Sequence, residues 1–190
     1  MDMFAKGGRR DHGQVLANGG LAAISAMMYA LRGEMLWLVS LIGALAAVTA
    51  DTWATELGVL ARRRPRLITT GRAVDAGTSG GVTLEGTLAT AGGAGLIGLA
   101  AAFLLNRWMI ILIALAGGMV GAFFDSLLGA TVQAIYRCPS CSRETERHPL
   151  HTCGHGTQLL RGWSWLSNDV VNFIASLVGA VTALIFWNLL

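Results

Sequence analysis

The sequence predicts an all-α integral membrane protein with about five transmembrane helices and a cytoplasmic loop rich in cysteine and histidine. Of the 190 residues, 54% are hydrophobic and 13% are charged, whereas about a quarter of the residues of an ordinary soluble domain are charged. Five apolar segments are each long enough to cross a bilayer, which takes about 20 helical residues. Basic residues cluster between these segments. We expect a single membrane domain over residues 1–190.

The five expected helices follow from apolar runs bounded by polar or basic residues. The first run, QVLANGGLAAISAMMYALR, follows basic residues as a signal peptide does, but it lacks a clear small-residue cleavage site, so we expect a retained helix. Glycines recur inside the third and fourth runs, and we interpret them as points where helices pack closely. The predicted spans are residues 14–32, 35–59, 83–105, 107–133 and 168–190.

The distribution of Lys and Arg predicts the orientation. The N-terminal tail, the connection after the second span and the connection after the fourth span together hold twelve of the fourteen basic residues. Basic residues favour the cytoplasmic side of a membrane. We therefore expect a cytoplasmic N-terminus, a C-terminus outside, and an active face on the cytoplasmic side.

With this topology, all five spans present polar residues at the same membrane face. Asp51, Asp125 and Asp169 are the candidate catalytic carboxylates, because each is embedded in apolar sequence. A charged residue at membrane depth costs roughly 2.5–3.5 kcal/mol on insertion scales, so it usually faces a cavity, a partner or an ion. The alternative is that these residues end helices at the headgroup level and pair with nearby arginines. Further candidates at this face are Gln14, Asn18, Thr55, Gln133, Asn168 and Asn172.

The residue types at this face indicate a hard cation. Carboxylate and amide oxygens suit Mg²⁺ better than softer metals. Asp51 and Thr55 are spaced i, i+4 and share one helical face, so we expect them to face inward together. We predict that Asp51, Asp125 and Asp169 bind Mg²⁺.

The connection after the second span, ARRRPRLITTGRAVDAGTSGGVT, predicts an anion site. Glycines ahead of a helix expose backbone N–H groups, and the helix dipole adds positive potential. No Gly-Lys-Ser/Thr follows, so this is not a Walker A loop, and arginines here are also what the topology alone requires. The candidate phosphate contacts are Arg9, Arg10, Arg72, Thr78, Ser79, Gly80 and Gly81.

The cytoplasmic loop over residues 137–166 contains CPSCSRETERHPLHTCGHG. Cys138, Cys141, Cys153 and His155 have a spacing that predicts a structural Zn²⁺ site of the three-cysteine, one-histidine type. His148 or His151 is the alternative fourth ligand. A free thiol pair or a redox switch would also account for the cysteines.

Five ordered motifs, GRRDHGQVLANGG, ADTWATELG, GTSGGVTLEG, FDSLLGATVQ and WLSNDVVNF, resemble an integral membrane family. It is the family of transmembrane protein 19, or domain-of-unknown-function 92, which includes the plastid phytyl-phosphate kinase of tocopherol synthesis. The resemblance implies phosphate transfer from a nucleoside triphosphate, CTP in the plant enzyme, to an isoprenyl monophosphate such as phytyl phosphate. Members generally carry one or two further hydrophobic helices before the first motif.

These observations favour a prenyl-phosphate kinase that uses Mg²⁺ and CTP or another nucleoside triphosphate. A small membrane transporter or flippase with carboxylate ion sites is the alternative, although it would place polar residues near the bilayer midplane. A non-catalytic membrane scaffold is a third. The expected partners are the lipid bilayer, the nucleotide and the prenyl monophosphate, with no nucleic acid. Glycine- and alanine-rich helix faces also allow a homodimer.

Overall fold

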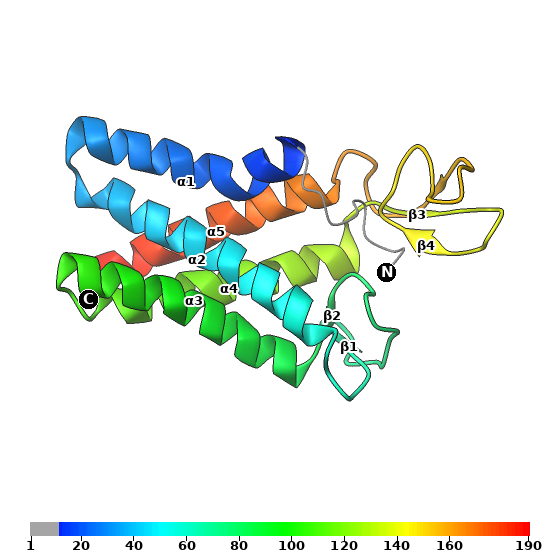
Figure 1. The fold of residues 1–190 in the computed structure, drawn as a ribbon, viewed down its shortest axis with the longest axis horizontal. Helices are drawn as coiled ribbons and strands as arrows, with labels where there is room; N and C mark the ends of the chain where they lie inside the picture. Colours follow the sequence, from blue (N-terminus) through cyan, green and yellow to red (C-terminus); the bar gives the residue numbers. More distant parts are fainter. Residues whose placement is uncertain (1–11) are drawn as a thin grey trace.

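A computed structural model describes residues 12–190 and contains five long helices (Figure 1). All five are long and apolar enough to cross a membrane, which confirms the predicted number of spans. Their ends fall within three residues of the predicted ones. The helices are α1 (His12–Arg32), α2 (Met35–Gly58), α3 (Leu84–Leu105), α4 (Ile110–Thr131) and α5 (Asn168–Leu189).

Helix α2 lies at the centre of the bundle and packs against each of the other four helices. Figure 1 shows the helices running side by side, with the α1–α2 and α3–α4 connections and the C-terminus at one end. The two longer connections lie at the opposite end, which we call the loop end. Successive connections therefore lie at alternate ends of the bundle, as expected from the sequence, and the two basic connections lie at the same end.

Glycines allow the central helices to approach closely. A Cβ added to Gly121 of α4 would lie 2.5 Å from Cβ of Ala47 on α2 and 2.9 Å from the carbonyl oxygen of Ala175 on α5. A Cβ added to Gly117 of α4 would lie 2.7 Å from the carbonyl oxygen of Gly179 on α5. Small residues commonly mediate helix packing in membranes. The interpretation of the span glycines as packing residues is thus supported at these positions.

Both long connections contain short strands that were not predicted. The α2–α3 connection pairs β1 (Arg66–Leu67) with β2 (Gly81–Val82), and the α4–α5 connection forms a three-stranded antiparallel sheet. In that sheet β3 (Ile135–Arg137) lies between β4 (Glu144–Thr145) and β5 (Gln158–Arg161). Strands of two to four residues are too short to produce a recognisable alternation of apolar and polar residues.

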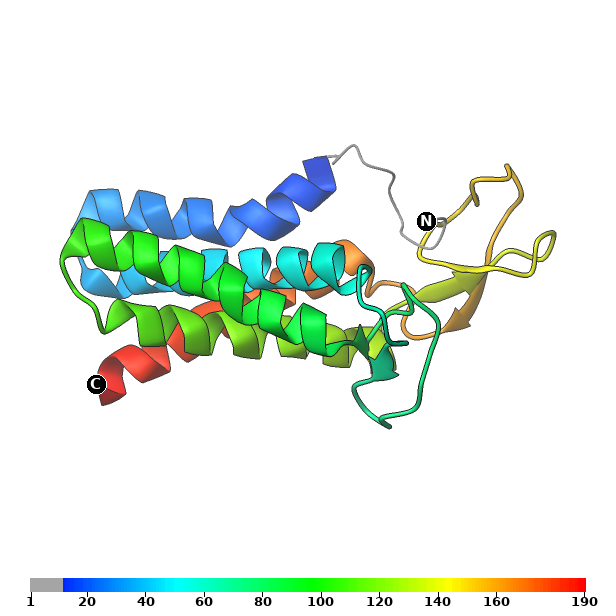
Figure 2. The same ribbon diagram turned by 60° about the horizontal axis from the view of Figure 1, so that its bottom comes forward.

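The three-stranded sheet is joined directly to the helix ends. Trp163 donates its backbone N–H to the carbonyl of Val132 at 2.9 Å, and Ala134 donates to that of Leu166 at the same distance. The Arg161 guanidinium donates to the carbonyl of Gly129 at 3.0 Å, near the C-terminus of α4 where a cation is favourable. Figure 2 shows the sheet extending from the bundle beyond α4 and α5.

Candidate functional site

A narrow pocket lies among four helices toward the loop end of the bundle. Its polar lining comprises Asn18 of α1, Asp51 of α2, Asp125 of α4, and Asn172 and Ser176 of α5. The first four lie about one to two turns inside the loop-end terminus of their own helix. The pocket has no interior room for a water molecule. The structure therefore gathers two of the predicted carboxylates and two of the predicted amides at one depth.

The chemistry of this pocket suits a small cation. One carboxylate oxygen of Asp125, Oδ2, is buried and has no hydrogen-bond partner among the described residues. The carboxylate of Asp51 lines the same pocket. Buried carboxylates without partners are costly, and hard oxygen donors of this kind are those that Mg²⁺ prefers.

Glu146 lies near this site, outside the pocket lining, and the sequence analysis missed it. It follows β4 in the α4–α5 connection, outside the five spans, and it is half-buried. The only sequence signal would have been a carboxylate in the loop that follows Gln133, and loop residues cannot be assigned a depth from helical periodicity.

Gln133 connects the two long connections to the start of α5. It is 1% exposed, and its Nε2 donates to Oε1 of Glu146 at 2.8 Å and to Oδ1 of Asn168 at 3.4 Å. Its Oε1 accepts a hydrogen bond from the Ser79 hydroxyl at 3.1 Å. The predicted residues Ser79, Gln133 and Asn168 therefore form one hydrogen-bonded network.

The remaining predicted residues lie outside the pocket lining. Thr55 is exposed, one turn nearer the end of α2 than Asp51, so this predicted inward-facing pair is not formed. Asp169 lies in the first turn of α5, half-buried, and Gln14 is half-buried on α1. Arg72 is exposed on the α2–α3 connection. Arg9 and Arg10 lie outside the described residues.

The glycine loop differs from the predicted anion cradle. Thr78 and Gly81 donate their N–H groups to the carbonyls of Asp75 and Thr78. Gly80 has φ +82°, and a Cβ there would lie 2.5 Å from Ala130 of α4. Glycine is therefore required at this position by the backbone conformation and by the close contact with α4.

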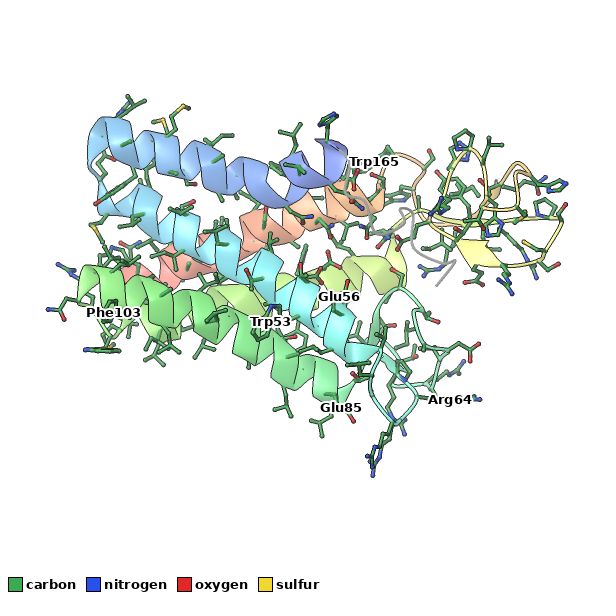
Figure 3. The ribbon with its side chains drawn as sticks, in the orientation of Figure 1. Trp53, Glu56, Arg64, Glu85, Phe103 and Trp165 are labelled. Carbon is green, nitrogen blue, oxygen red and sulfur yellow. The ribbon has the colours of Figure 1, made fainter. Side chains whose placement is uncertain are left out.

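The loop also does not lead directly into α3. β2 and Thr83 intervene, and the Thr83 hydroxyl caps the helix by accepting from the N–H of Gly86 at 2.9 Å. Figure 3 shows Glu85 at this end of α3, Glu56 on α2, and Phe103 at the opposite end of the bundle. The N-terminus of α3 is therefore capped by Thr83 and is separated from the glycine loop by β2.

Four side chains of the α4–α5 connection form a cluster, which we call the cysteine–histidine cluster: Cys138, Cys141, His151 and Cys153. One ligand atom of each lies within 4.8 Å of the others. Sγ of Cys153 lies 3.5 Å from Sγ of Cys138 and 4.0 Å from that of Cys141. Zn–S bonds of about 2.3 Å in a tetrahedron require sulfur atoms about 3.8 Å apart. This cluster could bind a metal ion.

The fourth member of the cluster is His151, so the prediction of His155 is wrong. Nδ1 of His151 lies 3.1 Å from Sγ of Cys153 and 3.4 Å from that of Cys141. His155 is exposed, and its Nδ1 lies 3.2 Å from the carbonyl oxygen of Cys153. The turn from His151 to His155 points the two rings apart, which residue spacing alone does not reveal. A backbone hydrogen bond from Cys141 lowers the pKa of the Cys138 thiol.

Comparisons with known proteins extend over most of the chain. An uncharacterized membrane protein of Methanocaldococcus jannaschii is 36% identical over 91% of this chain and 60% of its own length. Protein PGR of Arabidopsis thaliana is 32% identical over 92% of this chain and 68% of its own. Protein VTE6, chloroplastic, of the same plant is 26% identical over 94% of this chain and 48% of its own.

The chain thus spans roughly half to two thirds of the length of these relatives. No solved structure matches it significantly. Residues 2–180 match the family described as integral membrane protein DUF92. With this match and five helices long and apolar enough to cross a membrane, the chain belongs to the DUF92 family of integral membrane proteins.

Proposed function

We propose that this protein transfers the terminal phosphoryl group of a nucleoside triphosphate, with CTP favoured, to an isoprenyl monophosphate such as phytyl phosphate. The observation that carries the proposal is the pair of carboxylates, Asp51 and Asp125, lining one pocket about two turns inside the bundle. Family membership supports the reaction class. The depth of the pocket suits a substrate whose chain lies in lipid and whose phosphate lies near the surface.

In this proposal Asp51 and Asp125 bind Mg²⁺, with Asn18 and Asn172 as neutral oxygen donors. The unpartnered oxygen of Asp125 supports that assignment. The cation would neutralise the nucleotide phosphates as charge moves to the leaving group. The pocket is too narrow to admit a phosphate, so the phosphates would lie at its mouth. There, Ser79, Gly80, Arg72, Arg9 and Arg10 are the candidates for phosphate contacts.

The reaction needs no strong general base. A phosphate oxygen of the prenyl monophosphate is already ionised at neutral pH and attacks the terminal phosphorus of the nucleotide. The bond to the bridging oxygen breaks, and the nucleoside diphosphate leaves with its electron pair. The protein's contribution is positioning and charge neutralisation. With the positive-inside rule, the loop end faces the cytoplasm.

We also propose that the cysteine–histidine cluster binds a structural Zn²⁺ ion. Three thiolates and one imidazole at near-tetrahedral separations support zinc over the hard cation of the carboxylate pocket. Such an ion would order the connection rather than take part in phosphate transfer.

The proposed reaction is tested with purified full-length protein, Mg²⁺, labelled CTP or ATP, and a panel of prenyl monophosphates. We expect a labelled prenyl diphosphate, reduced at least a hundredfold by Asp125→Asn. Glu56→Gln is the matched control, because Glu56 is an exposed carboxylate on α2 outside the pocket. Absence of labelled diphosphate with every pair, or equal activity of both variants, would contradict the proposal.

A further inference from the structure

Glu146 occupies an unusual position for a residue of a connecting loop. It accepts a hydrogen bond from Nε2 of the buried Gln133 at 2.8 Å, and the same nitrogen donates to Asn168, one helical turn before the pocket residue Asn172. Asp51 and Asp125 belong to membrane helices, whereas Glu146 follows β4 in the α4–α5 connection. A third carboxylate therefore lies near the pocket at the loop end, outside the pocket lining.

The cysteine–histidine cluster encloses the segment that carries Glu146. Cys138 and Cys141 precede it, and His151 and Cys153 follow it, so a metal ion bound to all four would close the loop between Cys141 and His151. Closing a loop removes conformational freedom from the residues inside it. Glu146 lies midway along that loop.

Contacts on both sides of Glu146 orient its backbone within the loop. Thr145 is fully buried, and its hydroxyl accepts the N–H of Arg147 at 3.1 Å. The Thr157 hydroxyl donates to the carbonyl of Arg147 at 3.0 Å. The ring of His148 stacks on Tyr136 of β3 with centroids 4.5 Å apart. These contacts join the loop to β3 and to the residue that precedes β5.

We propose that Glu146 is the third carboxylate of the cation site and that the metal-bound cysteine–histidine cluster holds it there. The inference rests on the proposed cation and zinc sites. It gives the cluster a positioning role: the metal closes the loop, the loop presents Glu146 to Gln133, and the added charge strengthens cation binding at Asp51 and Asp125. Affinity for hard cations rises with the number of charged ligands.

Mn²⁺ is the probe for the carboxylate site, and its binding to the purified full-length protein is measured by electron paramagnetic resonance without any substrate. Glu146→Gln retains an acceptor for Gln133 and removes only the charge, so we expect affinity to fall about tenfold or more. Glu144→Gln is the matched control, because Glu144 is an exposed carboxylate two residues away on β4. It should bind Mn²⁺ as the parent does.

The outcomes separate this inference from the proposed reaction. If the parent binds Mn²⁺ and Asp125→Asn abolishes binding, but Glu146→Gln binds normally, the role of Glu146 is refuted and the cation site stands. If the parent binds no Mn²⁺, both the cation site and the role of Glu146 are refuted. Mn²⁺ binding without prenyl-phosphate kinase activity would contradict the reaction alone.

The positioning role of the metal is tested by elemental analysis and hydrogen exchange. We expect one zinc per chain in the parent and in His155→Ala, and loss of zinc in His151→Ala. Removal of zinc by a chelator should speed amide exchange over residues 142–150 and weaken Mn²⁺ binding, with α3 unchanged. Absence of stoichiometric zinc in the parent, or unchanged exchange and Mn²⁺ affinity after zinc removal, would overturn the coupling.

Discussion

Gln133 is the residue at which the polar contacts of three chain segments meet. A single buried amide accepts from Ser79 and donates to Glu146 and Asn168, and so joins the α2–α3 connection, the sheet and the start of α5. Gly162 packs against the backbone of Gln133. It has φ +82°, and a Cβ at this position would collide with the carbonyl group of Gln133. The site thus depends on one amide that has no charge of its own.

Replacing Gln133 by Leu should destabilise the protein by about 2–4 kcal/mol. Leu has a similar volume but leaves Ser79 and the Glu146 carboxylate without their amide partner, and an unsatisfied buried polar group costs about 1–3 kcal/mol, more when charged. Thermal unfolding in detergent measures the change. Gln158→Leu is the control, because Gln158 is exposed on β5. Equal unfolding midpoints for the two variants would contradict the role assigned to Gln133.

At the scale of the helices, α2, α4 and α5 are held together by backbone contact at small residues. Gly121 of α4 fits between Ala47 and Ala175, so the two helices that carry Asp51 and Asp125 are fixed relative to each other one turn from the carboxylates. Close packing of the backbones sets the width of the pocket. A change at this contact should therefore affect both stability and the cation site.

Gly121→Ala should destabilise the bundle by about 1–3 kcal/mol, because the added methyl group overlaps Ala47 and the helices must move apart. Gly19→Ala on α1 is the matched control. Nothing lies within 4 Å of a Cβ there, and alanine is the better helix former, so we expect an equal or higher unfolding temperature. If both substitutions shift the unfolding temperature alike, close packing at Gly121 does not limit stability.

At the scale of the whole molecule, the bundle has the surface of a membrane protein. Large apolar side chains such as Phe103, Leu104 and Leu88 are 80%, 80% and 65% exposed. Trp37, Trp108 and Trp187 lie at helix ends opposite the loop end, whereas Trp163 and Trp165 stack on each other beside the start of α5. Tryptophan is enriched at both membrane surfaces. These two groups are consistent with a bilayer around the helices and the sheets outside it.

The orientation of the molecule is checked with reporter fusions at the C-terminus. If the loop end is cytoplasmic, as the positive-inside rule predicts, alkaline phosphatase fused after Leu190 should be active and green fluorescent protein there should be dark. Fusions that end in the α4–α5 connection should give the reverse pattern. A fluorescent C-terminal fusion would place the carboxylate pocket on the other side of the membrane.

The bundle could be predicted from the sequence more fully than the site. The lengths of the apolar segments predicted all five helices. A helix advances by a fixed rise per residue, so the sequence also predicted a similar membrane depth for Asn18, Asp51, Asp125 and Asn172. Loops have no such regularity. Glu146 and the choice of His151 over His155 depend on how the sheet folds back on α4, and the cap formed by Thr83 depends on two strands too short to detect.

The sheet also joins α4 to α5 through hydrogen bonds, in addition to the covalent link of the peptide chain. β3 follows α4, β5 precedes α5, and the two strands pair directly, while Ala134, Trp163 and Arg161 bond across the junction. The tip between β4 and β5, which carries His151 and Cys153 of the cysteine–histidine cluster, is therefore not the sole link between the two helices. A protein expressed as two fragments that meet after Gly154 keeps all four cluster residues on the first fragment, so the two fragments should reassemble in the membrane.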